Sequence, residues 1–386
     1  MILHWPAVTA TLVAIVSCGY IVVAAIVVSL FARRRIPIRP AATPGITILK
    51  PLYGAEPGLF DNLASFCNQN YQGDVQIICG VRDPNDRAIA VFKSLQNAYA
   101  DRDLDLVVDA TLLGSNRKVS NLANMAARIR HDVVIVADSD MRVDPDYLSR
   151  VVAALEAPGV GAVTCLYYGV PATGIWAQLS ALAINAHFLP SVVLGFKLGL
   201  ARPCFGSTIA LRRETLAEIG GFRAFADRLA DDYAIGEALH RRSRNIAIPP
   251  FAIAHQCTQT SARELWKHEL RWARTIRSID PLGYAGSIVT HAFPWALIAA
   301  ILDAGSSLFV LTLGMMLAAV ASRIALLHRV KRAYGLPPQE YWLVPVRDLL
   351  SFVVFIWSFV GRDVSWKGHR YRVFSGRMAS AGSAQQ

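Results

Sequence analysis

Hydrophobic side chains divide the chain into long apolar runs and a central region of short runs separated by polar residues. The first long run, Val8 to Ala32, contains no charged side chain, and it exceeds the roughly 20 residues that cross the hydrocarbon of a bilayer. Three arginines follow it directly, whereas a signal peptide carries its positive charges before a shorter apolar core. We therefore expect a transmembrane helix over residues 8–32. Because arginine clusters remain in the cytoplasm, the chain after this helix should begin there.

Two apolar stretches in the C-terminal third, Ile288–Leu302 and Gly305–Ala321, are separated by Asp303 and flanked by basic residues. Basic flanks are retained on the cytoplasmic side of a membrane. The pattern therefore predicts a transmembrane hairpin over residues 284–322 with both ends in the cytoplasm.

A shorter apolar stretch, Leu349–Gly361, begins after Arg347-Asp348 and leads into a basic C-terminal segment. It is shorter than a typical span, and basic residues on both sides disfavour a crossing. We expect an interfacial or re-entrant segment over residues 341–361, with a transmembrane segment as the alternative. The remaining residues, 362–386, should form a basic cytoplasmic tail.

The segment from 174 to 196 also lacks Asp, Glu, Lys and Arg and is long enough to cross a membrane. If it crossed, the acidic pairs Asp138/Asp140 and Asp231/Asp232 would face opposite compartments and could not share a site. We therefore expect residues 174–196 to form an interfacial helix beside that site. A buried core helix has the same pattern.

Between Arg39 and Asp280, short apolar runs alternate with helical stretches, which is typical of an α/β domain with a largely parallel sheet. We place this domain at residues 40–283. The expected strands are Ile46–Leu49, Val75–Val81, Leu104–Val108, Val133–Ala137, Val160–Cys165 and Thr208–Leu211. The expected helices between them are Leu59–Asn70, Ala88–Tyr99, Val119–Ile129 and Pro145–Leu155. In open sheets of this kind, ligands bind outside the carboxyl ends of the strands.

The composition agrees with a membrane protein that carries a folded domain. The 386 residues have a net charge of +11, and 54% are hydrophobic but only 17% charged. Soluble domains average roughly 25% charged residues. The lower charged fraction here, together with a mean hydropathy of +0.36, excludes a disordered chain and an ordinary soluble enzyme. The six cysteines form no Cys-x-x-Cys pair and no zinc-binding pattern, and we interpret them as buried thiols in a reducing compartment.

Carboxylates follow two of the expected strands. Asp83 comes after Val75–Val81, and Asp138-Ser139-Asp140 comes after Val133–Ala137. The chain has no Gly-x-Gly-x-x-Gly after its first strand and no P-loop, so the main sequence signals of dinucleotide oxidoreductases and of Walker-type NTPases are missing. An Asp-x-Asp pair can present oxygen ligands to a divalent cation, which neutralises a diphosphate. The same three residues also make a good turn or helix N-cap.

Two further elements carry candidate chemistry. Asp231 and Asp232 are the first residues of a helical pattern. Carboxylates at this position are stabilised by the positive end of the helix dipole, which is one explanation for them. The other explanation is that one of them is a general base. The predicted helix Arg263–Ile279 places His268 and Arg271 on one face, since positions i and i+3 are neighbours. Arg274 and Arg277 extend this basic row, which suits a diphosphate or lipid headgroups, and Trp272 suits a membrane interface.

Six motifs in order along the chain together resemble the ceramide glucosyltransferase family (glycosyltransferase family 21/2-like) and its bacterial, hopanoid-biosynthesis-associated branch. They are Ile48-Leu49-Lys50-Pro51-Leu52-Tyr53-Gly54, Asn116-Arg117-Lys118-Val119-Ser120-Asn121, Ala137-Asp138-Ser139-Asp140, Cys204-Phe205-Gly206-Ser207-Thr208, Leu229-Ala230-Asp231-Asp232-Tyr233 and Arg271-Trp272-Ala273-Arg274. The resemblance covers most of the chain. It implies a GT-A (Rossmann-like) glycosyltransferase domain, anchored at the cytoplasmic face of the inner membrane and supplied by a UDP-sugar.

The resemblance also implies roles for residues of the first strands. Asp83 is similar to the carboxylate that recognises the nucleobase, and Lys118 to a donor-site contact. Asp138 and Asp140 match the pair that binds the diphosphate and a divalent metal, Mg²⁺ or Mn²⁺.

The later motifs supply the remaining expected site residues. Asp232 matches the catalytic base, with Asp231 beside it. Arg271 and Trp272 match the end of the Gln-x-x-Arg-Trp signature. The chain departs from that signature because His268 occupies the Gln position.

The expected function is inverting transfer of a hexose, glucose or N-acetylglucosamine, from a UDP-sugar to the hydroxyl of a membrane lipid, a hopanoid of the bacteriohopanetetrol type or a ceramide. One base without a second nucleophilic carboxylate favours direct displacement over hydrolysis. No nucleic-acid partner is expected. A processive polysaccharide synthase is the nearest alternative, but it needs enough helices to enclose a channel. A membrane-anchored nucleotide-binding protein without activity is the other alternative.

Overall fold

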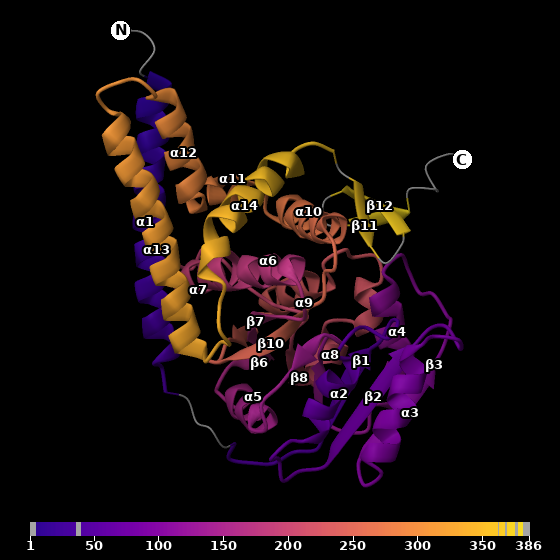
Figure 1. Cartoon of the computed structure of the whole chain (residues 1–386). Helices are drawn as coiled ribbons and strands as arrows, with labels where there is room; N and C mark the ends of the chain where they lie inside the picture. The colour runs from indigo at the N-terminus through magenta and orange to yellow at the C-terminus, as the bar shows by residue number, and fades with distance from the viewer. Residues whose placement is uncertain (1–4, 36–39, 362, 367–368, 375–376, 381–386) are drawn as a thin grey trace. The chain divides into compact units, whose positions relative to one another are not determined.

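A computed structural model describes residues 5–35, 40–361, 363–366, 369–374 and 377–380 (Figure 1). The chain forms two compact units. The helical unit comprises Met1–Arg33, Gly169–Ala201 and Gln259–Ser375, and the α/β unit comprises Arg34–Tyr168, Arg202–Thr258 and Gly376–Gln386. The predicted α/β domain is therefore interrupted, because residues 169–201 belong to the helical unit.

The α/β unit is built on a seven-stranded sheet in the order β3-β2-β1-β4-β8-β6-β9. The strands in chain order are β1 (Ile46–Pro51), β2 (Val75–Val81), β3 (Asp103–Val108), β4 (Val133–Val136), β6 (Val160–Thr164), β8 (Ile209–Arg212) and β9 (Asn245–Ala247). A smaller sheet has the order β5-β10-β7, with β5 (Met141–Arg142), β7 (Leu166–Pro171) and β10 (Ala252–Cys257). The central strands β1 and β4 are almost wholly buried, as expected for strands covered by helices on both sides.

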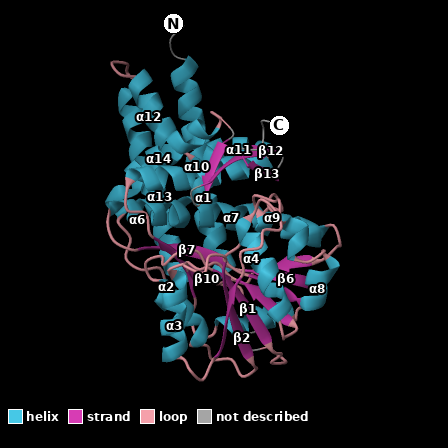
Figure 2. Cartoon of the chain, turned by 90° about the vertical axis from the view of Figure 1, so that its right-hand side faces the viewer, coloured by secondary structure: helices cyan, strands magenta, loops and turns pink. Residues whose placement is uncertain are grey.

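Helices flank the large sheet (Figure 2). They are α2 (Leu59–Cys67), α3 (Ala88–Ala98), α4 (Arg117–Met125), α5 (Tyr147–Leu155), α8 (Arg213–Glu218) and α9 (Asp231–His240). All the expected strands and helices of this region are present, with ends displaced by a few residues.

The sheet is less parallel than its sequence pattern predicted. β1 pairs in parallel with β2 and β4, but β8 runs antiparallel to both β4 and β6. The sequence analysis also omitted β5, β7, β9 and β10. Strand direction is set by where each connection crosses the sheet, which the apolar pattern of a single strand does not specify.

The strand order creates a topological switch beside β1. The chain moves from β1 outward to β2 and β3, and it then returns to the other side of β1 to form β4. Ligands of open α/β sheets bind at the carboxyl ends of the strands at such a switch. The position of β1 and β4 therefore marks the expected binding crevice.

The helical unit contains α1 (Trp5–Ala32), α6 (Ile175–Ala183), α7 (Leu189–Lys197), α10 (Ala262–Ile279), α11 (Pro281–Gly286), α12 (Ala292–Leu302), α13 (Phe309–Tyr334) and α14 (Val344–Ser358). A π-helical turn, Ile184–Phe188, joins α6 to α7. Strands β11 (Asp363–Trp366) and β12 (His369–Phe374) pair antiparallel, and β13 spans Arg377–Ser380. Much of the predicted basic tail is therefore strand, while positions 362, 367–368, 375–376 and 381–386 lie outside the described residues.

Helix α1 packs against other helices along one side. Its buried positions are Ala7, Ala10, Ala14, Ser17, Ile21, Ala24, Val28 and Phe31. Their alternating spacing of three and four residues forms a continuous stripe, and the small side chains allow close approach of α12 and α13. Toward α7, Tyr20 Oη donates to Ser191 Oγ at 2.9 Å. Helix α1 is thus both an apolar segment and a packed part of the helical unit.

Four helical segments among the described residues are long and apolar enough to cross a membrane. They are Trp5–Ala32, Ile175–Lys197, Phe309–Tyr334 and Tyr341–Ser358, and the pair Pro281–Thr290 and Ala292–Leu302, bent by 62°, is a fifth candidate if counted as one span. The 11 residues of α12 alone measure only about 16 Å at 1.5 Å per residue. The first arm of the predicted hairpin is therefore short, whereas its second arm, α13, continues past Ala321 to Tyr334.

Candidate active site

The first member of the candidate site is Asp138, which follows β4 at the switch point. Its Oδ1 lies 2.7 Å from Lys118 Nζ, and the same ammonium lies 3.4 Å from Asp231 Oδ2. Lys118 thus joins two carboxylates that are 93 residues apart in the sequence, counted as 231 − 138. Burial raises the pKa of Asp138, and Lys118 opposes that rise. Although burial alone would lower it, these carboxylates raise the pKa of Lys118.

The N-terminus of α4 holds Lys118 in place. Asn116 caps this helix by accepting from Val119 N at 3.1 Å, the usual role of Asn before a first helical turn. The Asn116 amide also donates to Arg228 O at 2.7 Å and to Asp231 Oδ1 at 3.4 Å. One buried amide therefore connects the start of α4 to the segment that opens α9.

Gly206 connects Asp138 to Asp232. Gly206 N donates to Asp232 Oδ2 at 3.1 Å, and Gly206 O accepts from Asp138 N at 3.1 Å. A Cβ at this position would lie 2.6 Å from Asp138 Oδ2 and 3.0 Å from Lys118 Nζ. Only glycine allows the backbone to approach both charged groups this closely.

Asp232 is the carboxylate with the most suitable pKa for proton transfer near neutral pH. Burial, aided by the charge of Asp231, raises its pKa to about 6. Two backbone donors, Gly206 N and Tyr233 N, fix the carboxylate, the second at 2.8 Å. A base is most effective when its pKa lies near the working pH.

Asp140 pairs with His255 on β10. His255 Nε2 lies 3.2 Å from Asp140 Oδ2, and the imidazole is only 5% exposed. Although burial acts against it, His255 lowers the pKa of Asp140 below its ordinary value. The other oxygen, Asp140 Oδ1, is buried and has no hydrogen-bond partner among the described residues. A carboxylate oxygen in that state has room to bind another positive group.

Lys50, on β1, supports the Asp138–Asp140 turn. Its side chain is fully buried, its Nζ donates to Asp138 O at 2.6 Å, and the ammonium lies 3.9 Å from the centroid of the Phe66 ring. Burial lowers the pKa of Lys50 to about 8, against the opposing effect of the nearby carboxylates. The lysine therefore orients the main chain of the Asp138–Asp140 turn.

Asp83 lies at the carboxyl end of β2 and is exposed. Its Oδ1 accepts from Asn85 N at 2.9 Å within its own turn. It shares the edge of the sheet with Asp138 because β1 lies between β2 and β4, but it does not belong to the group joined by Lys118 and Gly206.

His268, Arg271 and Trp272 lie on α10 in the helical unit. The His268 and Trp272 rings have centroids 5.0 Å apart, and Phe188 packs on Trp272 at 5.9 Å. The last two residues of the predicted basic row bind main-chain carbonyls: Arg274 donates to Val360 O, and Arg277 donates to Gly361 O. These carbonyls follow the C-terminus of α14, where positive side chains are favourable.

Sequence reasoning missed the contribution of His255 and left Lys50 and Gly206 without roles. The buried positions of β10 alternate, and His255 is one of them. A histidine on the buried side of a strand was therefore a usable signal. The partners of Lys50 and Gly206 come from distant segments, which no local pattern reveals.

The sheet, its switch point and the carboxylates beyond β4 define the class of protein: the fold is that of a GT-A glycosyltransferase. A mannosyltransferase from Pyrobaculum calidifontis, solved in complex with GDP-mannose and Mn²⁺, matches with a TM-score of 0.55 over 93% of this chain and 99% of that chain, at 17% identity. The family model for Glycosyl transferase family 21 matches residues 9–379, and the chain belongs to this family.

Curated relatives share part of their length with this chain. Ceramide glucosyltransferase 1 of Caenorhabditis elegans is 26% identical over 57% of this chain and 46% of its own length. Beta-monoglucosyldiacylglycerol synthase of Synechocystis is 26% identical over 54% of this chain and 42% of its own length. An N-acetylglucosaminyltransferase of Azorhizobium caulinodans is 22% identical over 60% of both chains. The chain thus spans about half the length of the curated relatives it matches.

Proposed function

We propose that the protein transfers a hexose from a UDP-sugar to the hydroxyl of a membrane lipid, with inversion at the anomeric carbon. The observation that carries the proposal is the convergence of Asp138, Lys118 and Asp232 around Gly206 at the switch point. Membership of family 21 and the names of the relatives support a lipid acceptor.

Asp232 is the proposed general base. Its carboxylate accepts the proton of the acceptor hydroxyl as the hydroxyl oxygen forms a bond to the anomeric carbon. The bond from that carbon to the diphosphate breaks, and its electron pair leaves with UDP. With one base and no covalent intermediate, the configuration inverts.

The charge that develops on the departing diphosphate needs positive partners. We propose that Lys118, which the family resemblance implies is a donor-site contact, also orients Asp138 toward the donor. Arg271, with Trp272 beside it, acts on the diphosphate, because its planar guanidinium matches phosphate oxygens. Asp83 is the proposed contact to the nucleobase. His268, in place of glutamine, and Asp231 support their neighbours Trp272 and Lys118.

The residues at the switch point fit a divalent cation. Asp140 supplies an unpartnered buried oxygen, and His255 holds the other oxygen of the same carboxylate in place. A carboxylate oxygen is a suitable ligand for Mn²⁺ or Mg²⁺. Among the described residues no group of three or more His, Cys, Asp and Glu could hold a metal. A site of this kind is completed by substrate phosphates and water. A bound cation would neutralise the diphosphate, and Asp138 is less available as a ligand because Lys118 already pairs with it.

The expected membrane is the inner membrane, with the α/β unit in the cytoplasm. The proposed acceptor is a hopanoid or a ceramide, and the relatives add diacylglycerol lipids. A direct test uses the full chain in detergent with UDP-glucose or UDP-N-acetylglucosamine and each lipid in turn, with the product identified by mass spectrometry. Lipids from cells with and without the gene provide the independent check. Release of UDP without any glycolipid, for every pair, would refute the proposal.

Chelation should stop this transfer reversibly. Removal of divalent cations with EDTA should abolish product formation, and addition of Mn²⁺ or Mg²⁺ should restore it, because the diphosphate otherwise leaves without charge neutralisation. The measurement is glycolipid formed per minute across a metal titration. Full activity at excess chelator would show that Asp140 and His255 form a structural pair.

Deletion of α1, residues 5–32, should lower membrane association and also destabilise the helical unit, while UDP binding persists. The buried stripe of α1 packs on α12 and α13, so we expect a fall in melting temperature of more than about 5 °C. Vesicle flotation, thermal unfolding and UDP binding measure the three effects. An unchanged melting temperature would show that α1 serves only as an anchor.

A further inference from the structure

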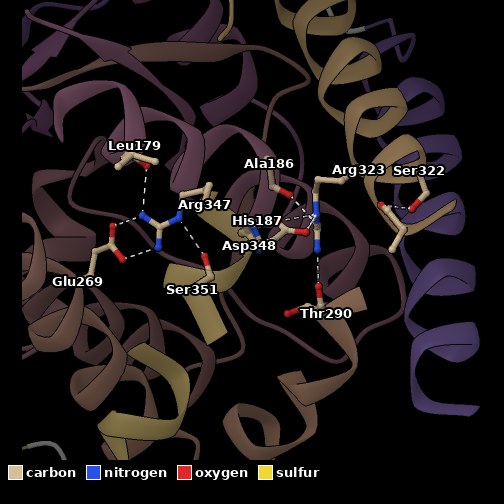
Figure 3. Close-up of polar contacts among 11 residues, drawn as sticks. Leu179, Ala186, His187, Glu269, Thr290, Ser322, Arg323, Arg347, Asp348 and Ser351 are labelled. Carbon is tan, nitrogen blue, oxygen red and sulfur yellow. Dashed lines mark hydrogen bonds and ion pairs between the residues drawn. The ribbon is translucent and has the colours of Figure 1, made fainter. Parts of the chain in front are cut away.

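Two adjacent charged residues of α14, Arg347 and Asp348, lie inside the helical unit. Each is 1% exposed. In the sequence they precede the apolar stretch Leu349–Gly361, and in the structure they lie within the helix Val344–Ser358. Figure 3 shows the two side chains pointing to different partners. Buried charges of this kind persist only when they are paired and hydrogen-bonded.

Arg347 holds α10. Its guanidinium forms a bidentate ion pair with Glu269, with Nη2 2.6 Å from Oε2, and it also donates to Leu179 O on α6 at 3.2 Å. Nε donates to Ser351 Oγ at 3.1 Å. The planar fork of arginine fixes both distance and orientation of a carboxylate. Because Glu269 follows His268 directly, Arg347 constrains the turn of α10 that carries the His268–Trp272 pair.

Asp348 holds the π-helical turn between α6 and α7. Its Oδ1 lies 2.8 Å from His187 Nε2, and it also pairs with Arg323 at 3.3 Å. His187 precedes Phe188, whose ring packs against Trp272. Asp348 therefore constrains the second aromatic neighbour of Trp272.

Arg323 completes this network by donating hydrogen bonds to two main-chain carbonyls. Neither carbonyl can accept the usual hydrogen bond from the residue four positions later, because that residue is a proline. Arg323 donates to Ala186 O at 3.0 Å and to Thr290 O (Figure 3). The residues four positions later are Pro190 and Pro294, which have no N–H to offer. Arg323 thus stabilises both irregular segments, and the Arg323–Asp348 pair ties them to α14.

We propose that Arg347 and Asp348 are positioning residues that set the orientation of the Trp272 indole and of α10 through Glu269 and His187. His268 and Phe188, whose rings both contact Trp272, are each adjacent in sequence to a residue held by this dipeptide. This inference rests on the proposed function, in which Arg271 and Trp272 act on the donor.

The decisive variant removes the Arg347–Glu269 pair without leaving a buried charge. Arg347→Met alone strands Glu269 and is expected to destabilise the fold, whereas Arg347→Met combined with Glu269→Leu replaces the pair by apolar groups, a change that proteins often tolerate. Arg347→Lys is the conservative variant, which keeps the charge but loses the bidentate fork. Arg329→Met, at an exposed position of α13, is the matched control.

We expect the double variant and Arg347→Lys to keep UDP affinity and melting temperature and to lose kcat by at least about tenfold, since small displacements of reacting groups have effects of this size. The same substitutions in a Trp272→Phe background should have much less effect, because coupled residues are not additive. A merely structural role would give equal losses in both backgrounds. Arg329→Met should match the parent.

Two outcomes would overturn the inference. One is a folded double variant or Arg347→Lys variant that transfers sugar at the parental rate. The other is a loss of kcat that is the same with Trp272 and with Phe at that position. If the double variant does not fold, Arg347→Lys decides. A parental protein without any transfer activity would instead refute the proposed function, so the two failures are distinguishable.

Discussion

Replacing Asp232 with asparagine should lower kcat for glycosyl transfer by about 10²–10⁴-fold, the usual contribution of a positioned base, while UDP binding is retained. Asparagine keeps the shape and can still accept from Gly206 N, which bonds the carboxylate at 3.1 Å, but it cannot take up the proton of the acceptor hydroxyl. Steady-state kinetics and calorimetric UDP binding measure the two effects.

The control is Asp101→Asn, a carboxylate with 78% side-chain exposure before the amino end of β3, which should behave as the parent. The pH profile gives a second check. Because burial and Asp231 raise the pKa of Asp232 to about 6, the base is protonated and inactive below that value. Activity should rise with pH through about 6 and then level off, and this limb should vanish in Asp232→Asn. Near-parental turnover of Asp232→Asn would remove the base assignment.

Substitution of the Asp140–His255 pair should have the second large effect. Asp140→Asn and His255→Ala should each weaken the apparent affinity for Mn²⁺ by more than about 100-fold, since even residues that only support metal ligands cost ten- to hundredfold when changed. Asp140 offers an unpartnered buried oxygen, and His255 orients the carboxylate through its other oxygen. Asparagine removes the negative charge, and alanine at position 255 removes the support.

The readout is the Mn²⁺ concentration that gives half-maximal transfer, together with Mn²⁺ binding in the presence of UDP. High Mn²⁺ should partly rescue Asp140→Asn but should not rescue Asp232→Asn. The control His328→Gln changes an exposed histidine of α13 and should leave the Mn²⁺ dependence intact. A parental Mn²⁺ response in both site variants would place the cation elsewhere.

The local pattern was sufficient for most elements of the α/β unit. Fully apolar runs such as Val133–Val136 can only be strands or helices buried on both faces, and carboxylates that follow such strands mark the ligand edge. Asp138 and Asp140 were therefore found from the sequence, whereas Asp231 and Asp232 were found because they open a helical pattern and match a family motif. The contacts among them were not, because Lys118 and Gly206 reach them from other segments.

The membrane-related segments show where pattern reasoning stops. A charge within an apolar stretch is interpreted as a boundary, so the predicted hairpin ended before Arg323 and the last apolar stretch, Leu349–Gly361, was placed after Arg347-Asp348. In the structure all three residues lie inside helices and are 1% exposed. Arg347 pairs with Glu269 and Arg323 pairs with Asp348, which also hydrogen-bonds to His187. Hydropathy along one segment does not register such partners.

Side-chain polarity at short range was enough to predict which segments are apolar, six of the seven strands of the large sheet and the carboxylates that follow β2 and β4. Local polarity did not predict the direction of β8, the pairing of Asp140 with His255 or the burial of Arg347 and Asp348. Each of these depends on a partner far away in the chain, and the free energy of a buried charge is decided by that partner rather than by its own neighbours.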